Sequence, residues 1–506
     1  MTQKSKRLYI IGAGFAGCTL ANEIAAKAIF GEVVAFLDDD PDKIGRKICG
    51  IPVLGPIRDV ARLLRMKAAD EAIIAMPGAS REYLKEIYTI LKRAGFQQIR
   101  ILPGISQILE GNAHLIQTRS IDPQDLLGRT PVAIKLKQSL EYLRGKRVLV
   151  TGAGGSIGSE LCRQLLCGGA SRLYLFGHGE NSIYQIDREL RLLQEEGVGE
   201  KASIVPVIGD LKDANYVNYI LGQLRADVVF HTAAYKHVPM MEENPVAAIE
   251  NNVLGTENLI LACEHHGVKR FVHITTDKAV EPASVYGASK YICEQMVLMA
   301  AQSSHAAQSS HAAQNSRCET NYMVVRFGNV IGSRGSIVPL FQQQIEKGGP
   351  VTVTHPDMRR WFMTIPEACS LVLQAGGVGE NGGLYLLDMG EPVRIRDLAE
   401  QMIRFYGFEP ETEIKIEYTG LRPGERLDER LLAEDEEVSE TGYSRILRVV
   451  RKSTPHVDIH ALLDELRPIC CFDSYRPQAY RDAGLLCAVL KEAIPTMQFE
   501  SELTYA

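Results

Sequence analysis

Residues 146–161, KRVLVTGAGGSIGSEL, decide the fold prediction for this chain. An apolar, β-branched run ends in a turn that contains Gly152, Gly155 and Gly158, and a helical pattern follows. A turn without side chains lets backbone amides and a helix N-terminus approach a pyrophosphate closely. The stretch therefore predicts the first strand, the phosphate-binding turn and the first helix of a Rossmann sheet.

Strand-like segments alternate with helical periodicity on both sides of this turn. From the turn onward they read RVLVTG, RLYLFG, SIVPVIGD, DVVFHTA, RFVHITT and YMVVRFGN, which is enough for a complete Rossmann sheet. A second opening of the same kind comes earlier, RLYIIGAGFAG at 7–17, followed by EVVAFLDDD, DEAIIAM and IRILPG. We therefore predict an α/β protein with two Rossmann-like, doubly wound parallel sheets in tandem.

Changes of pattern along the chain predict its domains. From about residue 330 the alternation weakens and loops rich in Gly, Pro and Arg appear, which suits a small substrate-binding lid at the carboxyl edge of the second sheet. The predicted segments are an N-terminal Rossmann-like domain at 1–118, a connector at 119–145, a catalytic domain with its lid at 146–440, and a helical tail at 441–506.

The bulk composition excludes several classes of protein. Hydrophobic residues make up 45% and charged residues 23%, as in an ordinary globular protein, and the formal net charge of −6 argues against a nucleic-acid partner. The N-terminus lacks a signal-peptide layout, and apolar runs stay shorter than a membrane span, so we expect a cytoplasmic protein without an integral membrane segment. The cysteines form no Cys-x-x-Cys pair, which predicts reduced thiols and no metal site.

The second glycine turn predicts a nicotinamide dinucleotide. Asp210 in GDLKD could bond an adenine amine, and the small residues of HTAAY leave room for a cofactor. The candidate cofactor-binding residues are Gly152, Gly155, Ser156, Ile157, Gly158, His178, Glu180, Asp210, Leu211, Ala233, Ala234 and Lys290.

The end of the next strand bears on NAD against NADP. An acid there would hold the ribose 2′-hydroxyl of NAD, but LYLFGHGEN places Gly177 and His178 at that position. An imidazole tolerates a 2′-phosphate, which favours NADP, whereas nearby Glu180 keeps NAD open.

The first glycine turn leaves the role of the N-terminal domain open. Gly12, Gly14 and Gly17 are followed by Asp38 at the spacing of an NAD fingerprint. This domain has no Tyr-x-x-x-Lys, so it is either a nucleotide-binding module or a purely structural one.

Residues 275–290, TTDKAVEPASVYGASK, carry the predicted chemistry. Tyr286 and Lys290 share a helix face, and the Lys290 ammonium together with an oxidised nicotinamide would lower the pKa of Tyr286. Tyr286 can then take a proton from a sugar hydroxyl while hydride leaves the same carbon. By chance alone a helix often carries Tyr and Lys at this spacing, but the upstream glycine turn argues against coincidence.

An acid and a base, Asp277 and Lys278, stand just before this pair. A ketone at C4 of a hexose acidifies the C5 proton, so a base at C5 and an acid at the C6 hydroxyl would together eliminate water. Hydride return to C6 would leave a 4-keto-6-deoxy sugar. A neutral lysine and a protonated aspartic acid are required for this step.

One stretch interrupts the pattern. Residues 300–317 read AAQSSH AAQSSH AAQNSR, three near-copies of a hexapeptide. Two histidines six apart do not share a helix face, so we interpret the repeat as a solvated insertion that lengthens a helix–strand loop rather than as a metal tract.

Several motifs in this order resemble the UDP-N-acetylglucosamine 4,6-dehydratases of bacterial polysaccharide and glycan synthesis, which are extended short-chain dehydrogenase/reductases. The motifs are TGAGGSIGSEL, HTAAYKHVPMMEENP, NNVLGT, TTDKAVEPASVYGASK, VVRFGNVIGSRGSIVP, HPDMRRWFMTIPEA, LDMGEP and TGLRPGERL, between about residues 130 and 435. The N-terminal domain also resembles the one in the long members of that family.

The resemblance implies a role for each matched residue. Asp277 would be the acid, Lys278 the base, Tyr286 the base of the hydride step and Lys290 its anchor, with Thr276 hydrogen-bonded to the 4-oxygen. The residues implied to hold the UDP portion are Asn329, Arg360, Arg422 and Glu425, of which the two guanidinium groups suit the diphosphate. Lys236 and His237 would line the sugar site. A homo-oligomer is expected.

Two departures from the family pattern matter. Long members carry membrane-spanning helices before the first Rossmann domain, whereas this chain starts at that domain, so we expect a soluble protein. Long members also often have methionine at the position of Tyr286, which leaves the C5 configuration of the product open.

Two other functions remain to be weighed. A UDP-sugar 4-epimerase or dehydrogenase of the same fold would need only Tyr286 and Lys290. A redox-sensing binding protein would keep the fold without turnover, but such sensors commonly lose the Tyr–Lys pair.

Overall fold

The computed structural model describes residues 7–27, 32–63, 71–76, 79, 81–96, 98–101, 119–120, 140–199, 201–309, 320–406, 408–452 and 457–497. The chain divides into two compact units. One comprises 1–133 with 340–351 and 397–417, and the other comprises 134–339 with 352–396 and 418–506. Each unit is described below by itself.

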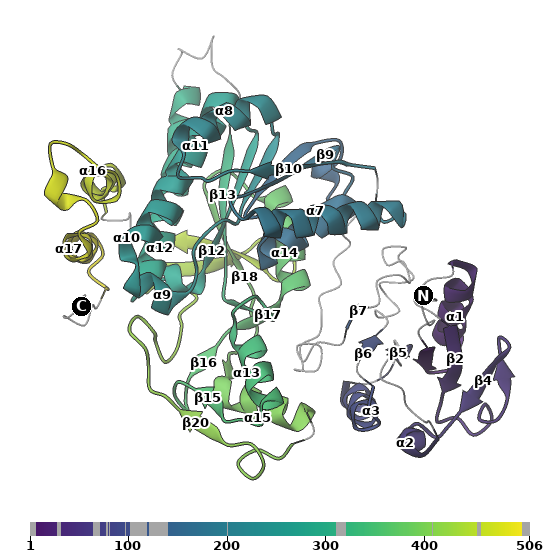
Figure 1. The fold of residues 1–506 in the computed structure, drawn as a ribbon. Helices are drawn as coiled ribbons and strands as arrows, with labels where there is room; N and C mark the ends of the chain where they lie inside the picture. Colours follow the sequence, from purple (N-terminus) through teal and green to yellow (C-terminus); the bar gives the residue numbers. More distant parts are fainter. Residues whose placement is uncertain are drawn as a thin grey trace. The chain divides into compact units, whose positions relative to one another are not determined.

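The first unit contains a seven-stranded sheet (Figure 1). Its order is β3-β4-β2-β1-β5-β6-β7, and β1 pairs in parallel with both β2 and β5. The strands are β1 (Arg7–Ile11), β2 (Glu32–Leu37), β3 (Lys47–Ile48), β4 (Ile51–Leu54), β5 (Glu71–Ile74), β6 (Gln98–Ile101) and β7 (Arg119–Ser120). The helices are α1 (Phe15–Lys27), α2 (Val60–Leu63) and α3 (Arg81–Arg93). The predicted Rossmann-like sheet is therefore confirmed here.

The second unit is built around a nine-stranded sheet, ordered β10-β9-β8-β11-β12-β13-β18-β22-β21. Its first six positions hold the six strands predicted from the sequence, all parallel, in the 3-2-1-4-5-6 order of a Rossmann sheet. These strands are β8 (Arg147–Thr151), β9 (Arg172–Gly177), β10 (Ser203–Ile208), β11 (Val228–His231), β12 (Arg270–Thr276) and β13 (Asn321–Phe327).

Three further strands extend this sheet, and the sequence reading missed them. β18 (Gly383–Leu387) continues it in parallel, and β22 (Ile446–Arg451) and β21 (Glu436–Glu440) complete it in antiparallel pairing. The helical prediction for the tail is wrong at β22. β21 reads EEVSE and is exposed at all but its first residue, so it has no apolar pattern to detect; its pairing with β22 comes from tertiary contact.

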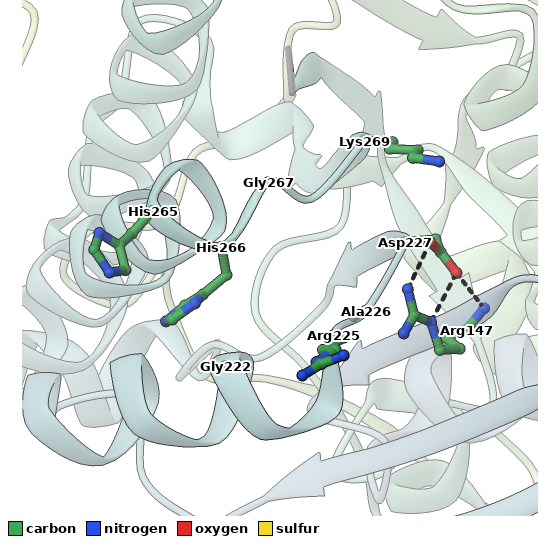
Figure 2. A pocket seen from close by; sticks show the side chains of 9 residues that line it. All are labelled: Arg147, Gly222, Arg225, Ala226, Asp227, His265, His266, Gly267 and Lys269. Atoms are coloured by element: carbon green, nitrogen blue, oxygen red, sulfur yellow. Dashed lines mark hydrogen bonds and ion pairs between the residues drawn. The ribbon is translucent and has the colours of Figure 1, made fainter. Parts of the chain in front are cut away.

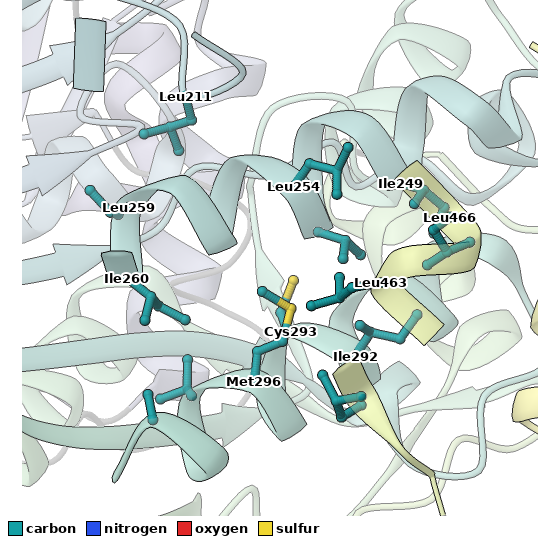
Figure 3. Close-up of a cluster of buried hydrophobic side chains, with 14 of the residues drawn as sticks. Leu211, Ile249, Leu254, Leu259, Ile260, Ile292, Cys293, Met296, Leu463 and Leu466 are labelled. Carbon is teal, nitrogen blue, oxygen red and sulfur yellow. The ribbon is translucent and has the colours of Figure 1, made fainter. Parts of the chain in front are cut away.

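Helices cover both faces of the nine-stranded sheet. On one face α6 (Ser156–Cys167), α7 (Glu180–Glu195) and α14 (Ile365–Val378) contribute to one apolar cluster. The helices of the other face are α8 (Ala214–Leu224), α9 (Val238–Glu243), α10 (Pro245–Ile249), α11 (Gly255–His266) and α12 (Val285–Ser309). Outside them, α16 (Ile459–Cys470) packs on α10 and α12, and α17 (Ala483–Ala493) packs on α10 and α16. Figure 3 shows Leu463 and Leu466 of α16 packed beside Ile249 and Ile292, which ties the tail to the helix that carries Tyr286.

Short strands and helices make up the region after β13. Three two-stranded ladders pair β14 (Asn329–Ile331) with β17 (Phe362–Thr364), β15 (Val351–Val353) with β20 (Ile416–Tyr418), and β16 (Arg359–Arg360) with β19 (Val393–Arg394). The helices here are α13 (Ile337–Glu346) and α15 (Ile395–Phe405).

The hexapeptide repeat begins as helix rather than as the predicted loop. Its first copies continue α12 to Ser309, because alanine and glutamine favour helix; residues 310–319 lie outside the described residues. Among the helices of the described ranges, none is long and apolar enough to cross a membrane.

Candidate active site

The predicted site residues of the second unit gather at the carboxyl ends of β8, β9, β11 and β12. Open parallel sheets place their ligands at this edge, since strand order brings successive loops together there. The glycine turn follows β8, His178 follows β9, Ala233 and Ala234 follow β11, and Asp277 follows β12.

The glycine turn has the geometry of a phosphate cradle. Gly152 has φ +66°, and a Cβ there would lie 2.8 Å from the Ala233 Cα and N atoms, so only glycine fits. A Cβ on Gly158 would collide with the Gly152 carbonyl. The first amides of α6, from Ser156 onward, have no preceding helical carbonyl to bond. These residues fit a dinucleotide pyrophosphate.

The residues predicted for the adenosine end lie around this turn. His178 is exposed and stands edge-on to Tyr235, with ring centroids 6.3 Å apart, and Glu180 is the first residue of α7. Asp210 Oδ1 accepts a hydrogen bond of 3.0 Å from the Lys212 amide. The side chain of Leu211 lies in the apolar core.

Asp277 and Lys278 form a close pair. The Lys278 Nζ donates to Asp277 Oδ1 at 3.0 Å and to Asn329 Oδ1 at 2.9 Å. The Thr276 hydroxyl donates to the same Asp277 oxygen at 2.8 Å. The Asp277 side chain is fully buried, and its Oδ2 has no hydrogen-bond partner among the described residues. The Oδ1 atom of Asp277 is therefore fixed by two hydrogen bonds, and its Oδ2 atom is free to bond a substrate.

Tyr286 and Lys290 lie on the first turns of α12, as the spacing predicted. Burial raises the pKa of Tyr286, the opposite of the lowering expected from Lys290 together with an oxidised nicotinamide, and the Asp277 carboxylate raises it further, whereas a hydrogen bond with Thr276 opposes the shift. The Lys290 Nζ donates to the Ile274 carbonyl at 2.7 Å and lies 3.2 Å from His273 Nε2. Burial lowers the pKa of Lys290.

Glu429 belongs to the site and was missed by the sequence reading. Its Oε1 lies 3.8 Å from Lys278 Nζ and 3.8 Å from the Arg360 guanidinium, and its side chain is only 7% exposed. The Glu429 carbonyl accepts from the Trp361 indole at 3.0 Å, and the Trp361 carbonyl accepts from the Asn329 amide at 2.9 Å. Because the Asn329 side chain also accepts from Lys278, these contacts form a closed ring that begins and ends at Lys278. The sequence signal that could have identified Glu429 is its position four residues after Glu425, in the same loop.

The Arg360 guanidinium binds backbone carbonyls of the loop that carries Glu429. It is buried, and its guanidinium donates to the carbonyls of Arg359, Arg426 and Leu427 at 2.7–3.0 Å. These bonds fix the segment that ends at Glu429.

The other predicted substrate residues are spread along the same rim. Arg422 is exposed, and the Glu425 carboxylate accepts from its amide at 3.2 Å, which closes their turn. Lys236 and His237 follow β11, and His237 packs against Gly335, where a Cβ would lie 2.6 Å from its ring. Burial lowers the pKa of both Lys236 and His237.

A pocket of about 530 Å³ lies elsewhere, at the amino ends of the strands (Figure 2). It is lined by Arg147, Gly222, Arg225, Ala226, Asp227, His265, His266, Gly267 and Lys269. Arg147 starts β8 and pairs with Asp227 through two guanidinium bonds of 3.1 Å. The pocket contains none of the predicted site residues.

Comparison with known proteins matches most of the chain. A family model described as "Polysaccharide biosynthesis protein" matches residues 148–451, and a "CoA-binding domain" model matches residues 2–103. The chain is 41% identical over 447 residues to the capsular polysaccharide biosynthesis protein CapD of Staphylococcus aureus, covering 88% of this chain and 72% of that protein.

Other relatives match a smaller share of the chain. The chain is 30% identical over 293 residues to a UDP-N-acetylglucosamine 4,6-dehydratase (inverting) of Campylobacter jejuni, covering 58% of this chain and 79% of that protein. The solved structure of Pen from Bacillus thuringiensis matches with a TM-score of 0.53 and 31% identity, covering 61% of this chain and 90% of that one. The chain therefore belongs to the polysaccharide biosynthesis protein family of extended short-chain dehydrogenase/reductases.

Proposed function

We propose that the chain is a nicotinamide-dependent 4,6-dehydratase that converts UDP-N-acetylglucosamine to a UDP-4-keto-6-deoxy-hexosamine and water. The contact of 3.0 Å between Lys278 Nζ and Asp277 Oδ1 carries the proposal, because a buried acid–base pair stands beside Tyr286. An enzyme that only oxidises or epimerises C4 has no task for this pair.

The first step belongs to Tyr286 and Lys290. Tyr286 accepts the proton of the C4 hydroxyl, and the Lys290 ammonium stabilises the phenolate. Held in the cradle of residues 152–158, a nicotinamide dinucleotide would take the hydride from C4 and later return it to C6. Thr276 lies between the tyrosine and Asp277, where its hydroxyl can hold the 4-oxygen.

Elimination belongs to Lys278 and Asp277. Once a proton has passed from Lys278 to Asp277, neutral Lys278 removes the C5 proton, which the C4 ketone has acidified, and protonated Asp277 gives its proton to the departing C6 oxygen. The free Oδ2 of Asp277 is the oxygen available for this transfer, and Gly328 lies beside it without a side chain. Lys278 returns a proton to C5 when hydride reaches C6.

The proton balance assigns a further task to Thr276. In each turnover Tyr286 gains the O4 proton and Asp277 loses one to the leaving water, so a proton must pass from the first to the second. Thr276 donates a hydrogen bond to Asp277 and lies close enough to Tyr286 to influence its pKa, so it is placed to pass the proton on.

The substrate and cofactor choices follow from the rim of the site. Arginine suits a diphosphate and glutamate suits ribose hydroxyls, so Arg422 and Glu425 are proposed to hold the UDP portion. His178 at the end of β9 favours NADP over NAD. Titration of the purified chain with each dinucleotide measures that preference directly.

Product mass tests the reaction. The chain is incubated with UDP-N-acetylglucosamine, and the product is analysed by mass spectrometry, with proton NMR for the C5 configuration. Loss of one water is expected. Unchanged mass with altered retention would instead indicate the 4-epimerase, and unreacted substrate in the presence of bound cofactor would indicate a sensor.

A further inference from the structure

A tight loop after β14 reaches from the substrate side of the site to the glycine turn. Gly332 and Gly335 adopt φ +75° and +69°, and the Ser336 amide donates to the Ser333 carbonyl at 3.0 Å. The loop starts three residues after Asn329, whose side chain accepts from Lys278. Arg334 stands at the tip of this turn.

Arg334 is attached to the glycine turn by two hydrogen bonds. Its amide donates to Ser156 Oγ at 3.1 Å, and its guanidinium Nη1 donates to the Gly154 carbonyl at 3.0 Å. These partners lie 178 and 180 residues earlier in the chain. The contact with His237 at Gly335 holds the other side of the loop.

The side chain of Arg334 is exposed. The guanidinium of Arg334 makes no ion pair with a carboxylate in the part of the chain that the structure describes. Other arginines of this unit do, among them Arg163, Arg326, Arg445 and Arg451. Arg334 instead lies beside the N-terminus of α6, which also carries partial positive charge. Two positive groups held together in this way favour an anion between them.

We propose that Arg334, which is held against the glycine turn, binds the pyrophosphate of the dinucleotide cofactor. A planar guanidinium can donate two hydrogen bonds to phosphate oxygens while the amides of α6 bond the remaining ones. The inference rests on the nicotinamide cofactor of the proposed function, and it does not depend on which reaction follows. A cofactor that is regenerated within each turnover does not need to dissociate between turnovers. The Arg334 guanidinium, added to the partial positive charge at the N-terminus of α6, would slow its release.

Two pyrophosphates could in principle meet this guanidinium, that of the dinucleotide and that of UDP. The bonds to Gly154 and Ser156 favour the dinucleotide, because these residues form the turn that begins α6. Binding of small probes separates the two sources. ADP carries the adenosine pyrophosphate, adenosine lacks it, and UDP represents the substrate.

The test uses the full chain, stripped of bound nucleotide, and isothermal titration with each probe. Arg334→Gln should weaken ADP binding by at least about tenfold, since the loss of a single charge-assisted bond already has that effect, and should leave adenosine and UDP binding unchanged. Arg334→Lys should restore part of the loss, since it keeps the charge without the planar fork. Arg188→Gln, at an exposed position of α7, is the matched control and should bind all three probes as the parent chain does.

The outcomes distinguish the possible errors. Equal ADP affinity in the parent chain and in Arg334→Gln overturns the inference, and so does a loss confined to UDP. An equal loss of ADP and adenosine means that the turn has been distorted, and it also counts against a pyrophosphate contact. If the parent chain binds neither ADP nor a nicotinamide dinucleotide, the cofactor of the proposed function is what fails.

Discussion

Lys278 Nζ lies 3.0 Å from Asp277 Oδ1, and both residues belong to the single turn that follows β12. Neighbours on a strand would point to opposite faces of the sheet. The one-turn helix Asp277–Ala279 changes that direction and brings the two side chains together beside Tyr286. The proposed division of labour can therefore be tested one residue at a time.

Lys278→Ala should separate oxidation from elimination. Tyr286 and Lys290 remain, so mixing the variant with UDP-N-acetylglucosamine should still reduce bound cofactor in part, visible as nicotinamide absorbance. Loss of water should fall by at least about a hundredfold, within the range for removal of a general base. Tyr286→Phe is the control and should abolish cofactor reduction as well. Turnover of Lys278→Ala at the parental rate would refute the role assigned to it.

Gly328→Ala should hinder the C6 hydroxyl. The new Cβ would lie 3.1 Å from Asp277 Oδ2 and 2.9 Å from the Trp361 Cβ, which is tighter than ordinary contact. Cofactor reduction should persist while water loss slows, measured in the same assay. Gly484→Ala in α17, where the nearest atom is 3.4 Å away, serves as the matched control and should behave as the parent chain. An equal loss of both steps would point to a general distortion instead.

Buried His231 should make the fold sensitive to acid. Its ring nitrogens contact the Thr151 and Thr256 hydroxyls at 2.7 and 2.8 Å, and burial, followed by the Lys290 charge, lowers its pKa to about 3. A lowered pKa means that the unfolded chain binds the proton more tightly. Stability is therefore complete above pH 6.5 and falls by about 1.4 kcal/mol per pH unit as the pH decreases toward 3.

The unfolding midpoint in urea, measured at several pH values, tests this expectation. His231→Gln removes one titrating group while offering amide atoms to the two threonines, so its slope between pH 6.5 and 4 should be shallower. His273, whose pKa burial also lowers, still contributes to the slope in the variant. Identical slopes in both proteins would exclude His231 as a source of the acid sensitivity.

Arg326→Met should destabilise the second unit strongly. Arg326 is 1% exposed and pairs with Glu294 at 2.7 Å and with Glu436 at 2.6 Å, so its loss leaves two buried carboxylates with less compensation. A cost of about 3–5 kcal/mol is expected from denaturant unfolding. Arg448→Met is the control: its pair with Glu380 is as short, 2.7 Å, but exposed, so a change below about 1 kcal/mol is expected. Similar losses in the two variants would contradict the argument from burial.

The same cluster predicts a second acid transition. Burial raises the pKa of Glu436, but the Arg326 bonds outweigh it and hold this pKa at about 2. A lowered carboxyl pKa stabilises the fold above pH 4.5, and this stability is lost as the pH falls toward 2.

Local pattern predicted the core of the second sheet well. The six apolar segments, the glycine turn and the Tyr286–Lys290 spacing were each readable because strand, turn and helix leave short-range signals. β21 left none, since Glu436–Glu440 is mostly charged and forms a strand only because β22 pairs with it. Arg360 was assigned to the diphosphate, yet its donors hold backbone carbonyls of the 426–427 segment.

By itself, the sequence determined the two strand–turn–helix openings, the six apolar strand segments of the second sheet and the residues of the 275–290 stretch, because these signals depend on spacing within about twenty positions. Only the tertiary structure decided which distant residues complete the site. Glu429 reaches Lys278, and Arg334 reaches Gly154, across more than a hundred positions in each case. Such contacts leave no periodic trace in the chain, since they exist only after the folded sheet has brought its loops to one edge.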